Sequence, residues 1–259
     1  MTTIGISLKM YFGFAQTLEW CAQTAALPAA LAPSNLELFV LPSFPALPAV
    51  VKLFDGSEVA VGAQDLAADD DGAQTGEVGG AMLAEIGCRY VEVGHAERRR
   101  LFGETEDVVA AKTAAALRHG LTPILCLGEA ARQPAGEAAA ECLRQLDAAL
   151  TVARATGLAG PIVVAYEPYW AIGAAEPAPD RHITEVCVAV GDVAHALPGH
   201  GGSQVIYGGS AGPGLLTRIG RSVDGLFLGR FAHDPAALAT VLDEAAALDA
   251  ETGESAVNR

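Results

Sequence analysis

The segment Val163-Val164-Ala165-Tyr166-Glu167-Pro168-Tyr169-Trp170-Ala171-Ile172-Gly173 combines a buried strand with a carboxylate at its end. From Ile162 to Tyr166 every residue is apolar, which is typical of a parallel strand buried on both faces. Pro168 cannot continue a hydrogen-bonded ladder, so Glu167 is expected where the strand stops. The residues that follow predict a loop able to cover it, and a covered carboxylate can act as a base. An isolated glutamate in such a place more often only caps a turn.

The rest of the chain repeats this alternation of short apolar strands and longer helices. About 32 residues per unit and eight such units predict one (β/α)8 barrel over residues 1–250, followed by a polar tail, 251–259. An open doubly wound sheet is disfavoured because no GxGxxG pattern follows the first strand. The expected strands are Ile4–Leu8, Leu36–Leu41, Val59–Ala63, Tyr90–Val93, Pro123–Leu127, Ile162–Tyr166, Gln204–Tyr207 and Gly225–Leu228. The expected helices include Thr17–Leu31, Asp107–Arg118, Glu137–Thr156, Thr184–Ala196 and Pro235–Leu248.

Composition excludes several classes of partner. The chain has 259 residues and a net charge of −15, which argues against nucleic acid and anionic membranes. Five widely spaced cysteines without a CxxC pattern predict reduced thiols rather than disulfides or a zinc site. No basic-then-apolar leader and no apolar run near ~18 residues is present, so we expect a cytoplasmic protein.

Three reactive side chains follow predicted strands: Lys9, His95 and Glu167. The C-terminal ends of all strands lie at one mouth of a barrel, so an amine, an imidazole and a carboxylate should converge there. Glycine-containing turns at 208–210 and 229–230 follow the last two strands. A lone histidine is more often structural, but a place directly before a helix start favours a functional one. The set suits proton transfer next to a carbonyl on an anionic substrate.

Several short motifs accompany the predicted strands: Ser7–Met10, Val61–Gln64 with Gly72–Glu77, Tyr90–Arg99, Ile124–Glu129, Ala165–Gly173 and Tyr207–Ser210. Through these motifs the chain resembles the triosephosphate isomerase family along nearly its whole length. Each similar motif alone is weakly specific, whereas all of them in this order and at barrel spacing make a specific match. The resemblance implies interconversion of dihydroxyacetone phosphate and D-glyceraldehyde 3-phosphate through an enediolate, with no cofactor.

The resemblance also implies roles for individual residues. Glu167 would be the base, and His95 beside Lys9 would hold the developing oxyanion, with the imidazole kept neutral by a helix N-terminus as in triosephosphate isomerase. Glu97 would pair with Lys9. Cys126 is expected to pack rather than to react. No metal is expected, because His95-Ala96-Glu97 is too sparse for a site. The substrate and its phosphate would be bound by Ser7, Gly173, Ser210, Gly229 and Arg230.

Five departures from the family pattern leave the substrate open. Ser7 stands where the family usually has asparagine, Ala96 replaces a serine, and Tyr169 replaces a smaller residue. Ala174-Ala175-Glu176 replaces Thr-Gly-Lys in the loop, and Arg230 replaces a glycine. One alternative is therefore an isomerase of a related sugar phosphate, such as a tetrulose (erythrulose) phosphate. Another is a non-catalytic barrel that binds a phosphorylated ligand, although retention of the three reactive side chains argues against it.

The segment Gly72–Glu77 resembles the family's interlocking dimer loop. It predicts a homodimer, with a free surface loop as the other interpretation. Tyr11 stands where a smaller interface residue is usual, so a tetramer also stays open.

Overall fold

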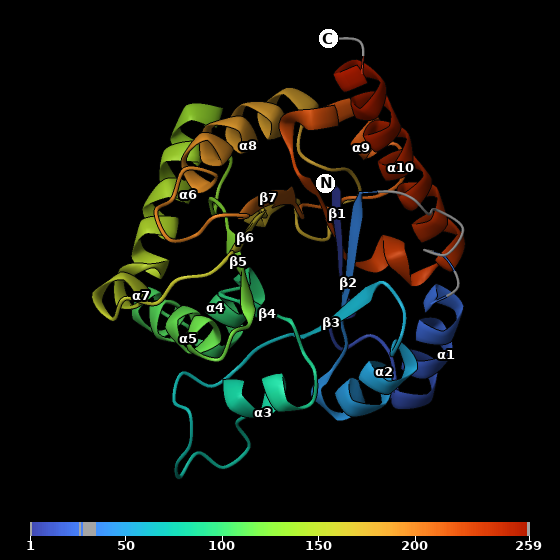
Figure 1. The fold of residues 1–259 in the computed structure, drawn as a ribbon. Helices are drawn as coiled ribbons and strands as arrows, with labels where there is room; N and C mark the ends of the chain where they lie inside the picture. Colours follow the sequence, from blue (N-terminus) through green and yellow to red (C-terminus); the bar gives the residue numbers. More distant parts are fainter. Residues whose placement is uncertain (1, 26, 28–34, 258–259) are drawn as a thin grey trace.

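A closed barrel of eight parallel strands forms the centre of the protein (Figure 1). The computed structural model describes residues 2–25, 27 and 35–257. Chain order and spatial order of the strands coincide, as the alternating pattern predicts. The strands are β1 (Thr2–Ser7), β2 (Leu36–Leu41), β3 (Val59–Ala63), β4 (Tyr90–Val93), β5 (Thr122–Leu127), β6 (Val163–Tyr166), β7 (Gln204–Tyr207) and β8 (Gly225–Leu228).

Pairing of β1 with β8 closes the barrel, with Thr3 opposite Gly225 and Ile6 opposite Leu228. Each strand is buried on both faces because one face fills the barrel and the other meets the helices. The inner cluster includes Phe39, Tyr90 and Phe227, and the ring of Phe39 stacks on Tyr90 with centroids 4.4 Å apart. This packing explains why the strands are continuous apolar runs in the sequence.

Helices surround the barrel on all sides (Figure 1). They are α1 (Phe14–Ala25), α2 (Leu47–Leu53), α3 (Gly80–Glu85), α4 (Ala96–Phe102), α5 (Glu106–Arg118), α6 (Ala135–Ala149), α7 (Thr151–Ala155), α8 (Asp180–Ala194), α9 (Leu215–Ile219) and α10 (Pro235–Val257).

The chain from Glu137 to Thr156, predicted as one helix, is instead divided at Leu150. The Thr151 hydroxyl donates to the carbonyl of Ala148, a local bond that competes with the helical ladder.

Three other predicted helices differ in extent by more than one residue. Helix α8 begins at Asp180, before the predicted start at Thr184, and ends at Ala194. Residues 26 and 28–31 of the predicted helix Thr17–Leu31 lie outside the described part of the chain, and α1 spans Phe14–Ala25. Helix α10 continues to Val257, so it extends beyond the predicted end at Leu248 and into the segment that was expected to be a polar tail.

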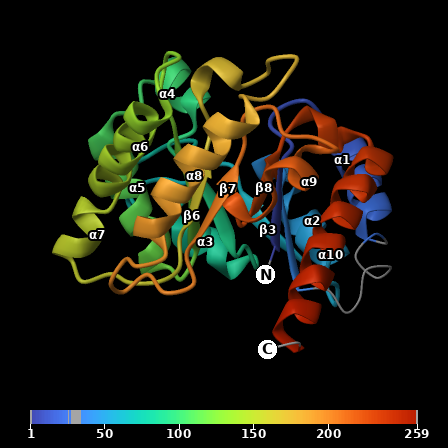
Figure 2. The same cartoon turned by 90° about the horizontal axis from the view of Figure 1, so that it is seen from above.

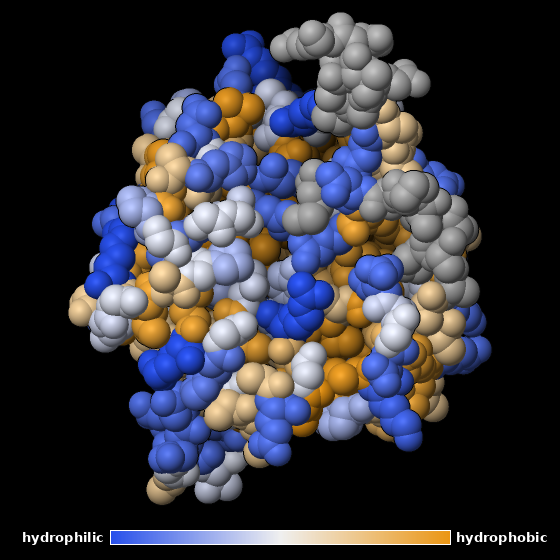
Figure 3. Space-filling model, viewed as in Figure 1, coloured by the Kyte–Doolittle hydropathy of each residue, from blue (hydrophilic) through white to orange (hydrophobic). Residues whose placement is uncertain are grey.

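The loops that follow the strands gather at one end of the barrel. Figure 2 shows this end on the upper side, with α4 nearby and both chain termini on the opposite side. Figure 3 therefore shows the face where the strands begin, on which hydrophilic and hydrophobic residues are interspersed. No described helix is both long enough and apolar enough to cross a membrane.

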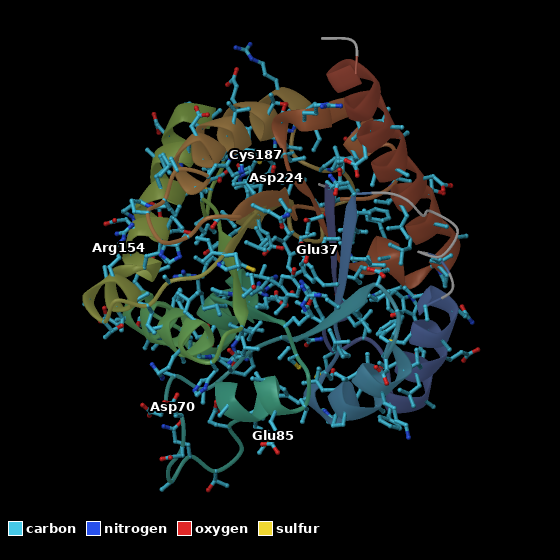
Figure 4. All side chains as sticks on the ribbon, viewed as in Figure 1. Glu37, Asp70, Glu85, Arg154, Cys187 and Asp224 are labelled. Carbon is cyan, nitrogen blue, oxygen red and sulfur yellow. The ribbon has the colours of Figure 1, made fainter. Side chains whose placement is uncertain are left out.

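The loop after β3 protrudes from the barrel, and residues 69–77 are exposed. Its base is fixed to α5, because Nη2 of Arg118 lies 2.7 Å from Oδ1 of Asp70 and Nε2 of His119 lies at the same distance. Figure 4 labels Asp70 on this loop. These contacts tie the base of the loop, at Asp70, to the C-terminal end of α5.

Candidate active site

A cavity of about 950 Å³ opens at the end of the barrel where the strands stop. All nine residues predicted to form the site line this one cavity, although they come from the ends of five different strands and the loops after them. They are Ser7, Lys9, His95, Glu97, Glu167, Gly173, Ser210, Gly229 and Arg230. The fold therefore brings together every residue that the sequence indicated.

Lys9 follows β1 in a backbone conformation that is rare for a residue with a side chain. Its φ is 48°, in the left-handed region. Its carbonyl oxygen accepts hydrogen bonds from Nε2 of Gln64 at 3.1 Å and Oγ of Ser43 at 3.1 Å. The Nζ of Lys9 lies 3.0 Å from Oε1 of Glu97. Burial lowers the pKa of Lys9, but the nearby carboxylates of Glu167 and Glu97 outweigh it and the net shift is upward, so the amine stays charged.

His95 caps the N-terminus of α4 with its own side chain. Its Nδ1 accepts the backbone N–H of Glu97 at 3.1 Å. A neutral imidazole with an accepting Nδ1 carries its proton on Nε2, so an N–H group faces the cavity. Burial and the charge of Lys9 lower the pKa of His95 to about 4. The ring is therefore neutral at physiological pH and acts as a hydrogen-bond donor.

Glu167 follows the last residue of β6 and is buried, with 4% of its surface exposed. Its Oε2 lies 3.4 Å from Nε2 of His95. Burial raises the pKa of Glu167 to about 8, although the charge of Lys9 acts in the opposite direction. Gly208 leaves room for this side chain, since a Cβ there would lie 2.6 Å from Oε1 of Glu167. Desolvation thus makes this carboxylate a stronger base than one in water.

The loop after β6, residues 168–178 and here called the lid, is fastened to the loops after β7 and β8. The Ser210 hydroxyl lies 2.7 Å from the carbonyl oxygen of Ala171 and 3.0 Å from that of Ala174, so it can donate to either. Nη2 of Arg230 donates to the carbonyl of Gly173 at 3.3 Å. In this arrangement the lid forms one wall of the cavity.

Glu129 holds the start of the lid. Its Oε1 accepts from Nε1 of Trp170 at 2.8 Å, and its Oε2 accepts from the hydroxyl of Tyr166 at 3.2 Å. His182 also lies next to this carboxylate, with Nε2 at 3.4 Å from Oε1. Glu129 therefore positions the lid and does not reach the cavity.

The sequence did not indicate one residue of this region, Glu92. Its side chain extends from β4 into the barrel, and its Oε2 accepts the Ser7 hydroxyl at 3.0 Å. Burial raises the pKa of Glu92 to about 7. The available signal was a single charged residue inside the otherwise apolar strand Tyr90–Val93. Within the described part of the chain, no three His, Cys, Asp or Glu side chains are grouped closely enough to hold a metal ion.

Comparison with known proteins gives consistent matches along the chain. The family model described as triosephosphate isomerase matches residues 2–245. An L-erythrulose-1-phosphate isomerase of Pectobacterium atrosepticum is 56% identical over 253 residues, which cover 96% of this chain and 97% of that protein. A triosephosphate isomerase of Symbiobacterium thermophilum is 42% identical, covering 85% and 88%. An L-erythrulose-1-phosphate isomerase of Rhizobium etli is 40% identical, covering 88% and 86%.

Proposed function

The chain belongs to the triosephosphate isomerase family, a family of isomerases, and we propose that it isomerises a four-carbon ketose phosphate of the erythrulose phosphate type. The observation that carries this proposal is the similarity to the Pectobacterium L-erythrulose-1-phosphate isomerase, which extends over nearly the whole of both chains. The substrate expected from the family resemblance, a triose phosphate, becomes the second candidate.

The two substrates differ by one group. In a tetrulose 1-phosphate, C1 carries the phosphate, C2 is the carbonyl, and C3 carries a hydroxyl and a terminal hydroxymethyl group. Dihydroxyacetone phosphate has a hydrogen in place of that hydroxymethyl group. Ser7 is a small residue on the inner wall of the cavity. It leaves more space than an asparagine would, which favours the larger substrate.

The same proton transfer serves either substrate. Glu167 removes the proton from the carbon next to the carbonyl, and an enediolate forms across the two carbons. The carboxylic acid then returns the proton to the former carbonyl carbon. The hydroxyl proton passes from one oxygen of the enediolate to the other by way of Nε2 of His95, so the carbonyl has moved one carbon away from the phosphate. The Nε2–H of His95 and the ammonium of Lys9 stabilise the developing negative charge on the oxygens.

The substrate phosphate is bound on the side of the cavity formed by the loops after β6, β7 and β8. Gly173, Ser210 and Gly229 belong to the loops after β6, β7 and β8, and their backbone N–H groups can cradle an anion. Arg230 begins a short 3-10 helix after β8 and adds a positive charge. In a protein of net charge −15, this local positive potential is needed to attract a phosphate.

The compartment and the oligomeric state are part of the same proposal. All five cysteines lie in the described part of the chain, and each is a buried free thiol. Free thiols suit a reducing compartment such as the cytoplasm.

Exposed features near the cavity end support a homodimer. They are the loop Gly72–Glu77 and the apolar side chains of Met10, Tyr11 and Phe14.

The test offers L-erythrulose 1-phosphate and dihydroxyacetone phosphate separately to the purified protein in heavy water. NMR follows deuterium incorporation and product formation together. A kcat/KM at least about tenfold higher for the tetrulose phosphate, a difference of ~1.4 kcal/mol in transition-state binding, supports the proposal. A preference for dihydroxyacetone phosphate would favour the second candidate, triose phosphate isomerisation. Binding of both compounds without any deuterium exchange would favour a non-catalytic barrel.

A further inference from the structure

Glu92 is a buried acidic group that the proton transfer described above does not use. Its side chain is 5% exposed and lies inside the barrel, where the neighbouring cluster is apolar. Its Oε1 lies 3.8 Å from Sγ of Cys126 and 3.9 Å from Nε2 of His95. Burying a carboxylate among apolar side chains costs desolvation free energy, which hydrogen bonds or an opposite charge must compensate.

The contact between Glu92 and Ser7 joins β4 to β1 across the inside of the barrel. The Ser7 hydroxyl donates its proton to Oε2 of Glu92 at 3.0 Å. A hydroxyl has one proton to donate and two lone pairs with which to accept. Ionised Glu92 can only accept, so above pH 7 it takes this proton and Ser7 presents only lone pairs elsewhere. Ser7 also lines the cavity. Oγ of Ser7 therefore offers the cavity a hydrogen-bond acceptor whose lone pairs are oriented by the bond to Glu92.

The position of this acceptor relative to the other groups indicates what it can bind. The phosphate cradle consists of loops after β6, β7 and β8, whereas the acceptor spans β1 and β4. Lys9, His95 and Glu167 also line the cavity, and the Nε2 of His95 lies near both Glu167 and Glu92. A substrate with its phosphate in the cradle and its reacting carbons at these three residues would direct its far end toward Ser7.

We propose that Ser7, oriented by Glu92, accepts a hydrogen bond from the terminal hydroxyl of a four-carbon ketose phosphate and so selects it over the three-carbon compound. This inference rests on the proposed function. Ser7 contacts the substrate, and Glu92 is a positioning residue that acts through Ser7. The triose phosphate lacks the terminal hydroxymethyl group, so it gains nothing from this acceptor.

The test compares kcat/KM for L-erythrulose 1-phosphate and dihydroxyacetone phosphate in the full-length protein and its variants. Ser7→Ala should lower the ratio of the two values by about two- to tenfold, the worth of one neutral hydrogen bond, mainly through KM for the tetrulose phosphate. Glu92→Leu should lower the ratio similarly. Glu92→Gln should largely preserve it, since the amide oxygen can still accept from Ser7.

Ser203→Ala is the matched control. Ser203 is a buried serine before β7 whose hydroxyl donates to the carbonyl of His200, at the opposite end of the barrel. Its removal should change stability but not the ratio. An unchanged ratio in Ser7→Ala, with wild-type protein active on both compounds, would overturn the inference alone. Wild-type protein inactive on the tetrulose phosphate would instead overturn the proposed function, and the inference with it. Ser7→Ala decides the question even if Glu92→Leu does not fold.

Discussion

Oε2 of Glu167 and Nε2 of His95 lie 3.4 Å apart, and among the described residues neither atom has an aligned hydrogen-bond partner. Buried polar atoms are usually satisfied, so these two adjacent atoms are an acceptor and a donor available to a ligand. One atom is an acceptor with raised basicity and the other carries a proton. Together they match a substrate that presents a C–H bond to the first and an oxygen to the second.

Glu167→Gln should abolish proton transfer because the amide cannot accept a proton. We expect deuterium incorporation into substrate to fall by about 10²- to 10⁴-fold, the usual contribution of a general base. NMR in heavy water measures the rate of this deuterium incorporation. Glu137→Gln, at an exposed position in the first turn of α6, is the control and should keep wild-type exchange. Exchange at the wild-type rate in folded Glu167→Gln would exclude Glu167 as the base.

The pH dependence of kcat/KM should rise through the pKa of Glu167. Burial raises this pKa to about 8, and only the ionised carboxylate is a base, so kcat/KM increases with pH and levels off above that value. His95, with its pKa lowered to about 4, stays neutral above that value. Burial raises the pKa of Glu92 to about 7, so Glu92 also titrates in this range, and the profile is measured in Glu92→Gln as well to isolate Glu167. Steady-state kinetics from about pH 6 to 9 measures the profile, and ³¹P NMR measures the separate ionisation of the substrate phosphate. A flat profile over this range would contradict the raised pKa.

Glu92→Gln should stabilise the protein increasingly as pH rises. Burial raises the pKa of Glu92 from 4.5 to about 7, so the folded state keeps a proton that the unfolded chain releases. The stability given by neutral Glu92 is full below pH 4.5 and is lost as pH rises to about 7. Glutamine avoids that loss, worth on the order of 3 kcal/mol. Urea unfolding below pH 4.5 and again above pH 7 measures the difference, and an equal effect in both conditions would argue against it.

Arg230→Ala should weaken phosphate binding. A charged hydrogen bond to phosphate is worth about 1.5–3 kcal/mol, and Arg230 is exposed, so we expect a KM increase of about tenfold at the low end of this range. Inhibition by inorganic phosphate should weaken in parallel. Arg181→Ala, an exposed arginine paired with Glu185 on α8, is the control. An unchanged KM would show that Arg230 serves only to hold the lid through Gly173.

The loop Gly72–Glu77 should mediate dimer formation. Light scattering should give twice the chain mass of 26.5 kDa. Thr75→Arg places a bulky charge at the exposed tip and should shift the protein toward monomer at micromolar concentration. Glu58→Arg, in another exposed turn, should not. A monomeric wild-type protein would contradict the prediction, and four times the chain mass would indicate a tetramer.

The sequence alone was sufficient for the barrel and for the position of its reactive side chains. Five of the eight strands have the predicted bounds, because strands buried on both faces are apolar runs with sharp ends. Placing Lys9, His95 and Glu167 at one end needed only the rule that parallel strands of a barrel end on the same side. The substrate preferred from the family resemblance was the triose phosphate, whereas the relative with 56% identity is named for the alternative, an erythrulose phosphate.

Only the tertiary structure decided how these groups act on one another. The bond between Ser7 and Glu92 joins residues 85 positions apart, and their pairing follows from the diameter of the closed barrel rather than from local sequence. The proton on Nε2 of His95 depends on which group its Nδ1 meets, here the N–H of Glu97. The raised pKa of Glu167 depends on how completely the folded chain excludes water. The local sequence specifies which reactive groups the chain carries. The distances between these groups and their removal from water set their chemistry, and both arise only when the barrel closes.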